Sequence, residues 1–126
     1  MRVLLGLFLI VHGWIHYGVW LSRQESMAFD PGRSWLLSRR GVSDGVQRNL
    51  AIAVAMLVGV VFAIAGIALL AGWGFWRPTT IIGAVVSLAL VVTYFSPWLS
   101  LALVIDVAMI VALVWAAWPP VSQVGS

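Results

Sequence analysis

The stretch RNLAIAVAMLVGVVFAIAGIALLA, residues 48–71, decides the fold, because its only charged residue is the first and it contains no proline. An α-helix of this length exceeds the roughly 20 residues that cross about 30 Å of bilayer hydrocarbon. Small residues recur at every fourth position, namely Ala51, Ala55, Gly59 and Ala63, with Gly66 beside them. Such a stripe lets two helices approach closely in a membrane. We expect it to pack against a helix of the same chain in preference to a second copy.

Three further segments share this apolar character, at about 3–21, 78–95 and 98–118. Turn signals such as Ser96–Pro97 bound these runs. Each is longer than a buried strand normally is, which favours helices. We therefore predict an all-α integral membrane four-helix bundle that forms a single domain over residues 1–126.

The composition indicates that the bilayer is the solvent of this chain. Of its 126 residues, 63% are hydrophobic and 9% are charged, and the mean hydropathy is +1.07. A soluble domain of this size cannot bury so much apolar surface. The chain has no cysteine, which excludes disulfides and thiol redox chemistry. The sequence pI near 10.7 reflects arginines that we assign to lipid headgroups, so we expect lipid contact and no nucleic-acid binding.

The arginines are distributed unevenly between the two expected membrane faces. The face with the connection 22–47 carries Arg23, Arg33, Arg39, Arg40 and Arg48. The opposite face carries only Arg2 and Arg77. The positive-inside rule therefore predicts that the connection lies in the cytoplasm and that both termini lie outside.

Local signals describe the ends of the spans. SWLLSRR, residues 34–40, mixes apolar and cationic side chains, which is typical of either a short interfacial helix or an ordinary polar loop, and we predict the helix. Asp44 with Gln47 resembles a capping box for the second span. The tail 119–126 is expected to be disordered.

Polar side chains collect at similar membrane depths when each span is threaded separately. At about 1.5 Å per residue, His12 and Ser87 fall near the middle of their spans and Asp106 falls close to it. His16 and Tyr94 follow toward the arginine-rich face. We therefore predict a site of His12, His16 and Asp106 that is supported by Ser87 and Tyr94. In it, His12 meets Asp106 and Ser87, and His16 lies on the path by which the site opens toward the arginine-rich face.

Asp106 is the sharpest signal, because it is the only acid in the four apolar spans. A charged side chain at the bilayer centre costs at least about 2.5–3.5 kcal/mol, so it faces the bundle interior and finds a partner. The same cluster is compatible with plain interhelical packing. His12, His16 and Asp106 do not define a metal site, and a hydrolytic Ser87 triad has no oxyanion-hole signature, so we predict neither.

The first span resembles the first helix of the DoxX-like bacterial membrane proteins. The shared residues are Arg2, Gly6, His12 and Gly13. The resemblance is closer to small relatives whose first helix reads H-G-x-I-H, here His12 to His16, and whose fourth helix carries an Asn or Asp, here Asp106. It implies a four-helix bundle with an accessory or redox-associated role. The chain departs from DoxX proteins in having His16 where a lysine is common and in its long arginine-rich connection.

Three functions are consistent with these residues. The first is a multi-pass protein of the bacterial inner membrane in which His12, His16 and Asp106 transfer protons or bind a small lipophilic ligand such as a quinone. The second is a structural subunit of a larger membrane complex or a homodimer, with outward-facing Trp14 as a contact. The third is an acid/base isomerase acting on a lipidic substrate.

Overall fold

A computed structural model describes residues 1–21 and 33–124 of the chain. Four of its helices are long and apolar enough to cross a membrane, at Arg2–Leu21, Asp44–Ala71, Trp76–Thr93 and Pro97–Trp115. The expected all-α fold with four membrane-length helices is confirmed, and the protein is by these criteria a multi-pass membrane protein. Arg23 and the rest of residues 22–32 lie outside the described residues.

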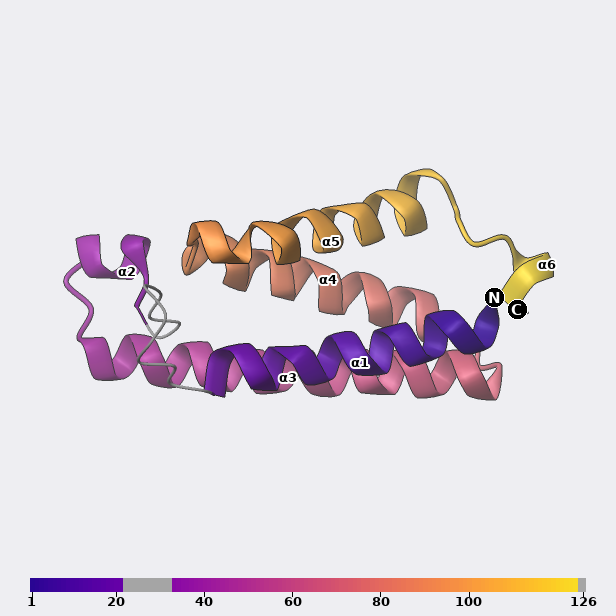
Figure 1. Cartoon of the computed structure of the whole chain (residues 1–126), viewed down its shortest axis with the longest axis horizontal. Helices are drawn as coiled ribbons and strands as arrows, with labels where there is room; N and C mark the ends of the chain where they lie inside the picture. The colour runs from indigo at the N-terminus through magenta and orange to yellow at the C-terminus, as the bar shows by residue number, and fades with distance from the viewer. Residues whose placement is uncertain (22–32, 125–126) are drawn as a thin grey trace.

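The helices follow one another in space as they do along the chain. They are α1 (Arg2–Leu21), α2 (Trp35–Arg39), α3 (Asp44–Ala71), α4 (Trp76–Thr93), the 3₁₀ turn η1 (Pro97–Leu99), α5 (Ser100–Ile110), the π-helix η2 (Val111–Trp115) and α6 (Val121–Val124). In Figure 1, α1 lies along α3, α3 packs on α4 and α4 packs on α5. Both chain termini lie at one end of the bundle, which we call the terminal end.

Glycines bring α1 and α3 into close contact. A Cβ atom on Gly13 would lie 2.7 Å from the carbonyl oxygen of Gly59, and one on Gly66 would lie 2.7 Å from that of Gly6. Real Cβ atoms do not approach backbone oxygens so closely, so these positions require glycine. The small-residue stripe thus serves the internal bundle, as predicted, because it is in contact with α1.

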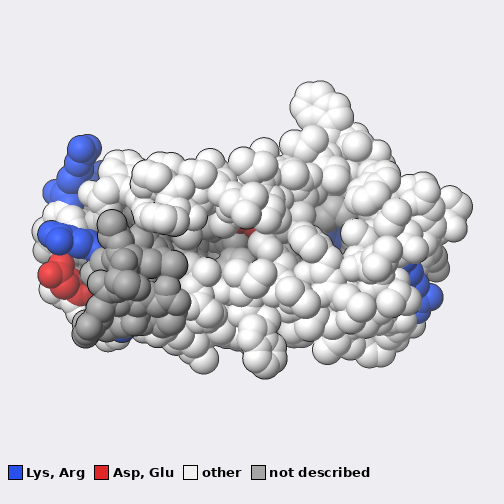
Figure 2. Space-filling model, in the orientation of Figure 1, with Lys and Arg blue, Asp and Glu red and all other residues white. Residues whose placement is uncertain are grey.

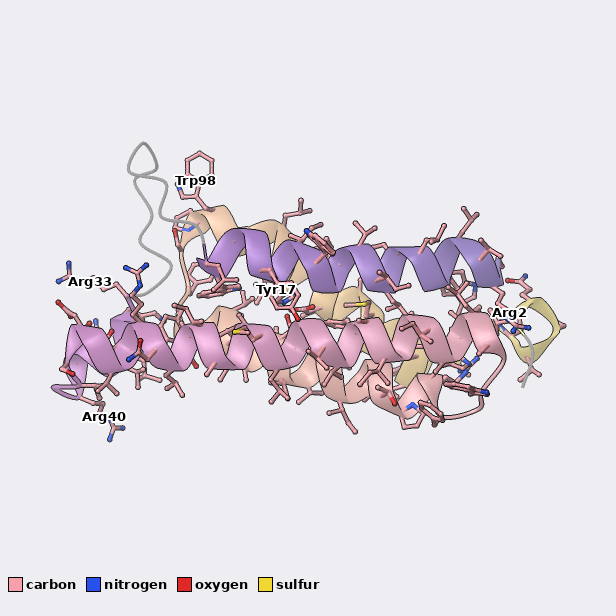
Figure 3. The ribbon with its side chains drawn as sticks, turned by 90° about the horizontal axis from the view of Figure 1, so that it is seen from below. Arg2, Tyr17, Arg33, Arg40 and Trp98 are labelled. Atoms are coloured by element: carbon pink, nitrogen blue, oxygen red, sulfur yellow. The ribbon has the colours of Figure 1, made fainter. Side chains whose placement is uncertain are left out.

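The arginines of the described residues lie toward the two ends of the molecule. Figure 2 shows them at both ends, with a middle that is almost entirely free of charged side chains on this face. Arg33 and Arg40 mark the end that holds α2, which we call the arginine-rich end, and Arg2 marks the terminal end (Figure 3). The Arg2 guanidinium donates hydrogen bonds to the carbonyl oxygens of Leu69 and Leu70 and so caps the C-terminus of α3.

The short helix between the first two spans is present as α2, and a buried glutamine fixes it. The Gln47 side chain accepts from the Ser34 backbone N–H at 2.9 Å and donates to the Val42 carbonyl at 2.7 Å. The N-cap of α3 is Ser43, which accepts from the Val46 backbone N–H, so the capping box predicted at Asp44 is wrong. Gln47 is unavailable for a capping box because it is engaged with α2 and its flanking residues.

Replacing this glutamine is expected to release α2. In Gln47→Ala, the Ser34 N–H and the Val42 carbonyl lose their partner, which costs about 1–3 kcal/mol where such groups are buried. Hydrogen exchange should therefore accelerate in α2 and leave α3 beyond its first turns protected. Asn49→Ala, which removes an exposed amide from the same helix, serves as the control. Equal exchange of α2 in both variants would contradict this role of Gln47.

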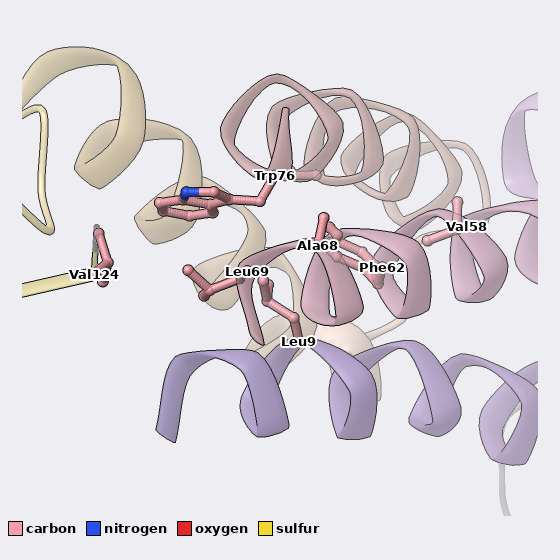
Figure 4. Close-up of a cluster of buried hydrophobic side chains, with 9 residues drawn as sticks. Leu9, Val58, Phe62, Ala68, Leu69, Trp76 and Val124 are labelled. Carbon is pink, nitrogen blue, oxygen red and sulfur yellow. The ribbon is translucent and has the colours of Figure 1, made fainter. Parts of the chain in front are cut away.

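Two apolar clusters fill the bundle. Figure 4 shows the one toward the terminal end, where Trp76, Leu9 and Leu69 pack together. The other lies toward the arginine-rich end and includes Trp20 and Tyr94, whose ring centroids are 5.5 Å apart. Residues 121–124, in the tail that was expected to be disordered, form the helix α6. Val124 of this helix is buried in the first cluster.

Candidate functional site

A chain of hydrogen bonds joins three spans near the middle of the bundle. The His16 Nε2 atom of α1 lies 2.8 Å from the Ser87 Oγ atom of α4. The Ser87 hydroxyl lies 2.5 Å from Asp106 Oδ2 of α5. Ser87 and Asp106 are fully buried and His16 is 5% exposed. These contacts connect α1 to α5 through α4.

The other nitrogen of His16 determines how protons can be arranged along this chain. His16 Nδ1 lies 3.0 Å from the backbone carbonyl oxygen of His12, which can only accept, so Nδ1 carries a hydrogen. The remaining contacts can then be filled in two ways. Either an imidazolium His16 donates to Ser87 and Ser87 donates to an Asp106 carboxylate, or a protonated Asp106 donates to Ser87 and Ser87 donates to a neutral His16.

These two arrangements differ only in the position of hydrogens. In going from the first to the second, Nε2–H of His16 passes its proton to Ser87 Oγ, and the Ser87 hydroxyl passes its own proton to Asp106 Oδ2. The imidazolium and carboxylate charges disappear together, and no heavy atom has to move far. The geometry is therefore that of a proton relay in which the serine hydroxyl both accepts and donates.

A second histidine faces the free oxygen of the aspartate. His12 Nε2 lies 3.4 Å from Asp106 Oδ1, beyond the usual 2.7–3.2 Å of an N–H···O hydrogen bond. Both atoms are buried, and neither has a hydrogen-bond partner among residues 1–21 and 33–124. Aromatic rings pack on His12. Its ring centroid lies 4.8 Å from that of Phe62 in an edge-to-face contact and 5.7 Å from that of Phe8, on which it stacks. The His12–Asp106 pair thus holds unused hydrogen-bonding capacity in an apolar setting.

Helix geometry explains which histidine reaches the serine. His12 and His16 are one turn apart, so they share a face of α1. Helical side chains lean toward the N-terminus, which brings the His16 ring back toward the level of His12. The sequence predicted that His12 would contact both Ser87 and Asp106, whereas His16 makes the serine contact. Trp14, between them in sequence, is 74% exposed and points away from the bundle, as predicted.

Tyr94 lies outside this network. Its hydroxyl donates to the backbone carbonyl of Gln47, and its ring packs on Trp20. Together with Leu90, Val91 and Leu99, these rings form the apolar cluster on the arginine-rich side of the site. The path predicted from the histidines toward the arginine-rich face is therefore occupied by packed side chains.

A cavity lies instead on the terminal side of the network. It is partly open, and its empty volume of about 350 Å³ includes the open space at its mouth. Its lining residues are Leu5, Phe8, Leu9, Trp76, Thr80, Met109, Ala112, Leu113, Trp118 and Pro119. Phe8 is one turn from His12, and Met109 is one turn from Asp106. Sequence patterns gave no sign of this cavity, because its lining is shared among three spans and the tail.

The fourth span changes its helical form beside this cavity. The α-helix α5 passes into the π-helix η2 at Val111, and Ala112 and Leu113 of η2 line the cavity. Wide helical turns of this kind recur at functional sites. Within the part of the chain that the structure describes, no group of three histidine or acidic side chains is arranged to hold a metal ion.

Comparisons with known proteins place no family name on this chain, because no family model, no curated protein and no solved structure matches it. The structure supports a small all-helical protein with four long apolar helices. It does not extend the resemblance of the first span to DoxX-like proteins into a family assignment.

Proposed function

We propose that this protein exchanges protons with a small lipophilic ligand inside a bacterial inner membrane, through the relay of His16, Ser87 and Asp106. The observation that carries the proposal is the continuous chain from the His12 carbonyl through His16 and Ser87 to Asp106. Ionisable groups within a span are costly, and this chain offers them two arrangements, one of which is uncharged.

The unpaired atoms of the His12–Asp106 pair support the same proposal. Hydrogen bonds at reacting groups are often long before a ligand binds and tighten in the complex. His12 Nε2 and Asp106 Oδ1 have that character at 3.4 Å. In this role His12 and Asp106 contact the ligand, and Ser87 and His16 take up or return the proton. Because arginine is concentrated at the end with α2, we place that end in the cytoplasm.

Substitution of Ser87 tests the relay. In Ser87→Ala, His16 and Asp106 remain but the hydroxyl that connects them is lost. We expect nitrogen and carbon NMR of the labelled protein to detect His16 and Asp106 changing protonation together in the unsubstituted chain and independently in the variant. Thr79→Val is the control, since the Thr79 hydroxyl of α4 donates to the carbonyl of Phe75, one turn earlier in the chain, and takes no part in the relay. Unchanged coupling in Ser87→Ala would exclude the relay.

A second function, that of a structural subunit, is favoured by one observation. Only 11% of the fourth span is buried inside the bundle, against 33–39% of each of the other three spans. Among the four described spans, this one therefore leaves the largest share of its residues uncovered by the rest of the described bundle. Affinity purification from native membranes separates the two functions, because an obligate subunit copurifies with its complex, whereas a protein that consistently purifies alone is not one.

A further inference from the structure

Two residues that line the cavity on the terminal side, Phe8 and Met109, each lie one helical turn along the chain from a member of the His12–Asp106 pair. We propose that this cavity binds a neutral, ring-containing lipophilic molecule with one hydroxyl group, and that this hydroxyl joins His12 Nε2 to Asp106 Oδ1. The inference rests on the proposed function, for which it names the class of ligand and the half of the bundle that receives it.

The lining of the cavity selects an uncharged, flat ligand. The aromatic side chains of Phe8, Trp76 and Trp118 and the thioether of Met109 form much of it, and none of the described lining residues is charged. Among these described residues the hydroxyl is that of Thr80, which already donates to the Trp76 carbonyl at 2.8 Å. A charged ligand would lose its solvation here without gaining a partner.

The two atoms without hydrogen-bond partners among the described residues, His12 Nε2 and Asp106 Oδ1, determine the polar group of the ligand. A histidine N–H needs an acceptor, and a carboxylate oxygen needs a donor. A single hydroxyl supplies both, because its oxygen accepts from His12 while its hydrogen is donated to Asp106. A hydrocarbon without this group leaves both atoms unsatisfied, and an ammonium group cannot accept from the histidine.

Phe8 connects the cavity to the pair. Its ring lines the cavity and stacks on His12 with the centroids 5.7 Å apart. The Phe8 side chain is 41% exposed, so it has room to rotate outward. In the ligand complex, the ligand ring takes the place beside His12 that Phe8 leaves, and the hydroxyl then reaches Asp106.

Two brominated probes test this inference on the full-length chain purified in detergent. Bromine quenches tryptophan fluorescence, and Trp76 and Trp118 line the cavity. We expect a bromonaphthol to quench saturably and to bind roughly tenfold or more tightly than bromonaphthalene, since only the naphthol satisfies the buried pair. Equal affinities, or quenching that rises linearly without saturation for both probes, would overturn the inference.

A matched pair of variants identifies the cavity as the binding site. Ala112→Leu adds volume inside it and is expected to weaken bromonaphthol binding by roughly tenfold or more, as overpacking of a filled site does. Ala108→Leu adds the same side chain one turn earlier, on the exposed surface of α5, and should bind like the unsubstituted chain. Equal binding by both variants would contradict the assigned site.

The outcome also distinguishes this inference from the proton relay. If bromonaphthol binds as expected while Ser87→Ala leaves the His16–Asp106 coupling intact, the ligand pocket stands and the relay fails. If the coupling depends on Ser87 but neither probe binds saturably, the relay stands and the pocket fails.

Discussion

Gly66→Ala is expected to lower the free energy of unfolding of the bundle by about 1–3 kcal/mol, which is the usual cost of adding volume to a well-packed interface. The added methyl would lie 2.7 Å from the Gly6 carbonyl oxygen, and α1 can relieve the clash only by moving away from α3. Association in membranes depends on such close packing, so the loss extends along the interface. Thermal unfolding in detergent, followed by circular dichroism, measures the effect.

Gly45→Ala controls for helix propensity. It lies in the first turns of the same helix, where an added methyl would meet nothing within 4 Å. Both substitutions favour helix by up to about 1 kcal/mol, so Gly45→Ala should be neutral or stabilising. Equal unfolding temperatures for the two variants would show that the close contact of α1 with α3 is not what holds the bundle together.

Asp106→Asn is expected to abolish proton exchange at the site and to leave the fold intact. The asparagine amide still accepts from Ser87, but no carboxyl remains to exchange a proton with His16. Interhelical hydrogen bonds in membranes rarely contribute more than about 2 kcal/mol, so the unfolding temperature should change modestly. The coupled response of His16 in the NMR titration should disappear.

Asp44→Asn provides the comparison for this variant. Asp44 is an exposed acid in the first turn of α3, far from the relay. It should keep the coupled response of His16 unchanged. If Asp106→Asn only lowers stability and the His16 response persists, the polar cluster is interhelical packing rather than a proton relay.

Depth along the helices was enough to predict which polar residues meet, because straight spans of known length place residues at calculable heights. His12, His16, Ser87 and Asp106 do lie together. Depth could not predict rotation or side-chain lean, and these determine that Ser87 bonds to His16. Tyr94 was assigned to the same track, but it lies two turns beyond Ser87 and finds a closer partner in the Gln47 carbonyl.

Local sequence rules were less reliable at the ends of the spans, where several polar groups compete. Ser43 and Asp44 are both good N-caps, and only the engagement of Gln47 by α2 decides between them. The π-helix at Val111–Trp115 follows a run of apolar residues that would also suit a regular α-helix.

The most direct test of the central claim is infrared spectroscopy of the unsubstituted protein in lipid vesicles across a range of pH. Subtraction of the Asp106→Asn spectrum assigns the carboxyl bands of Asp106, and labelled histidine assigns the ring bands of His16. If the two groups share a proton through Ser87, the bands of both groups change together in each step of the pH titration. An aspartate that stays ionised at every pH while the histidine bands change alone would contradict the relay.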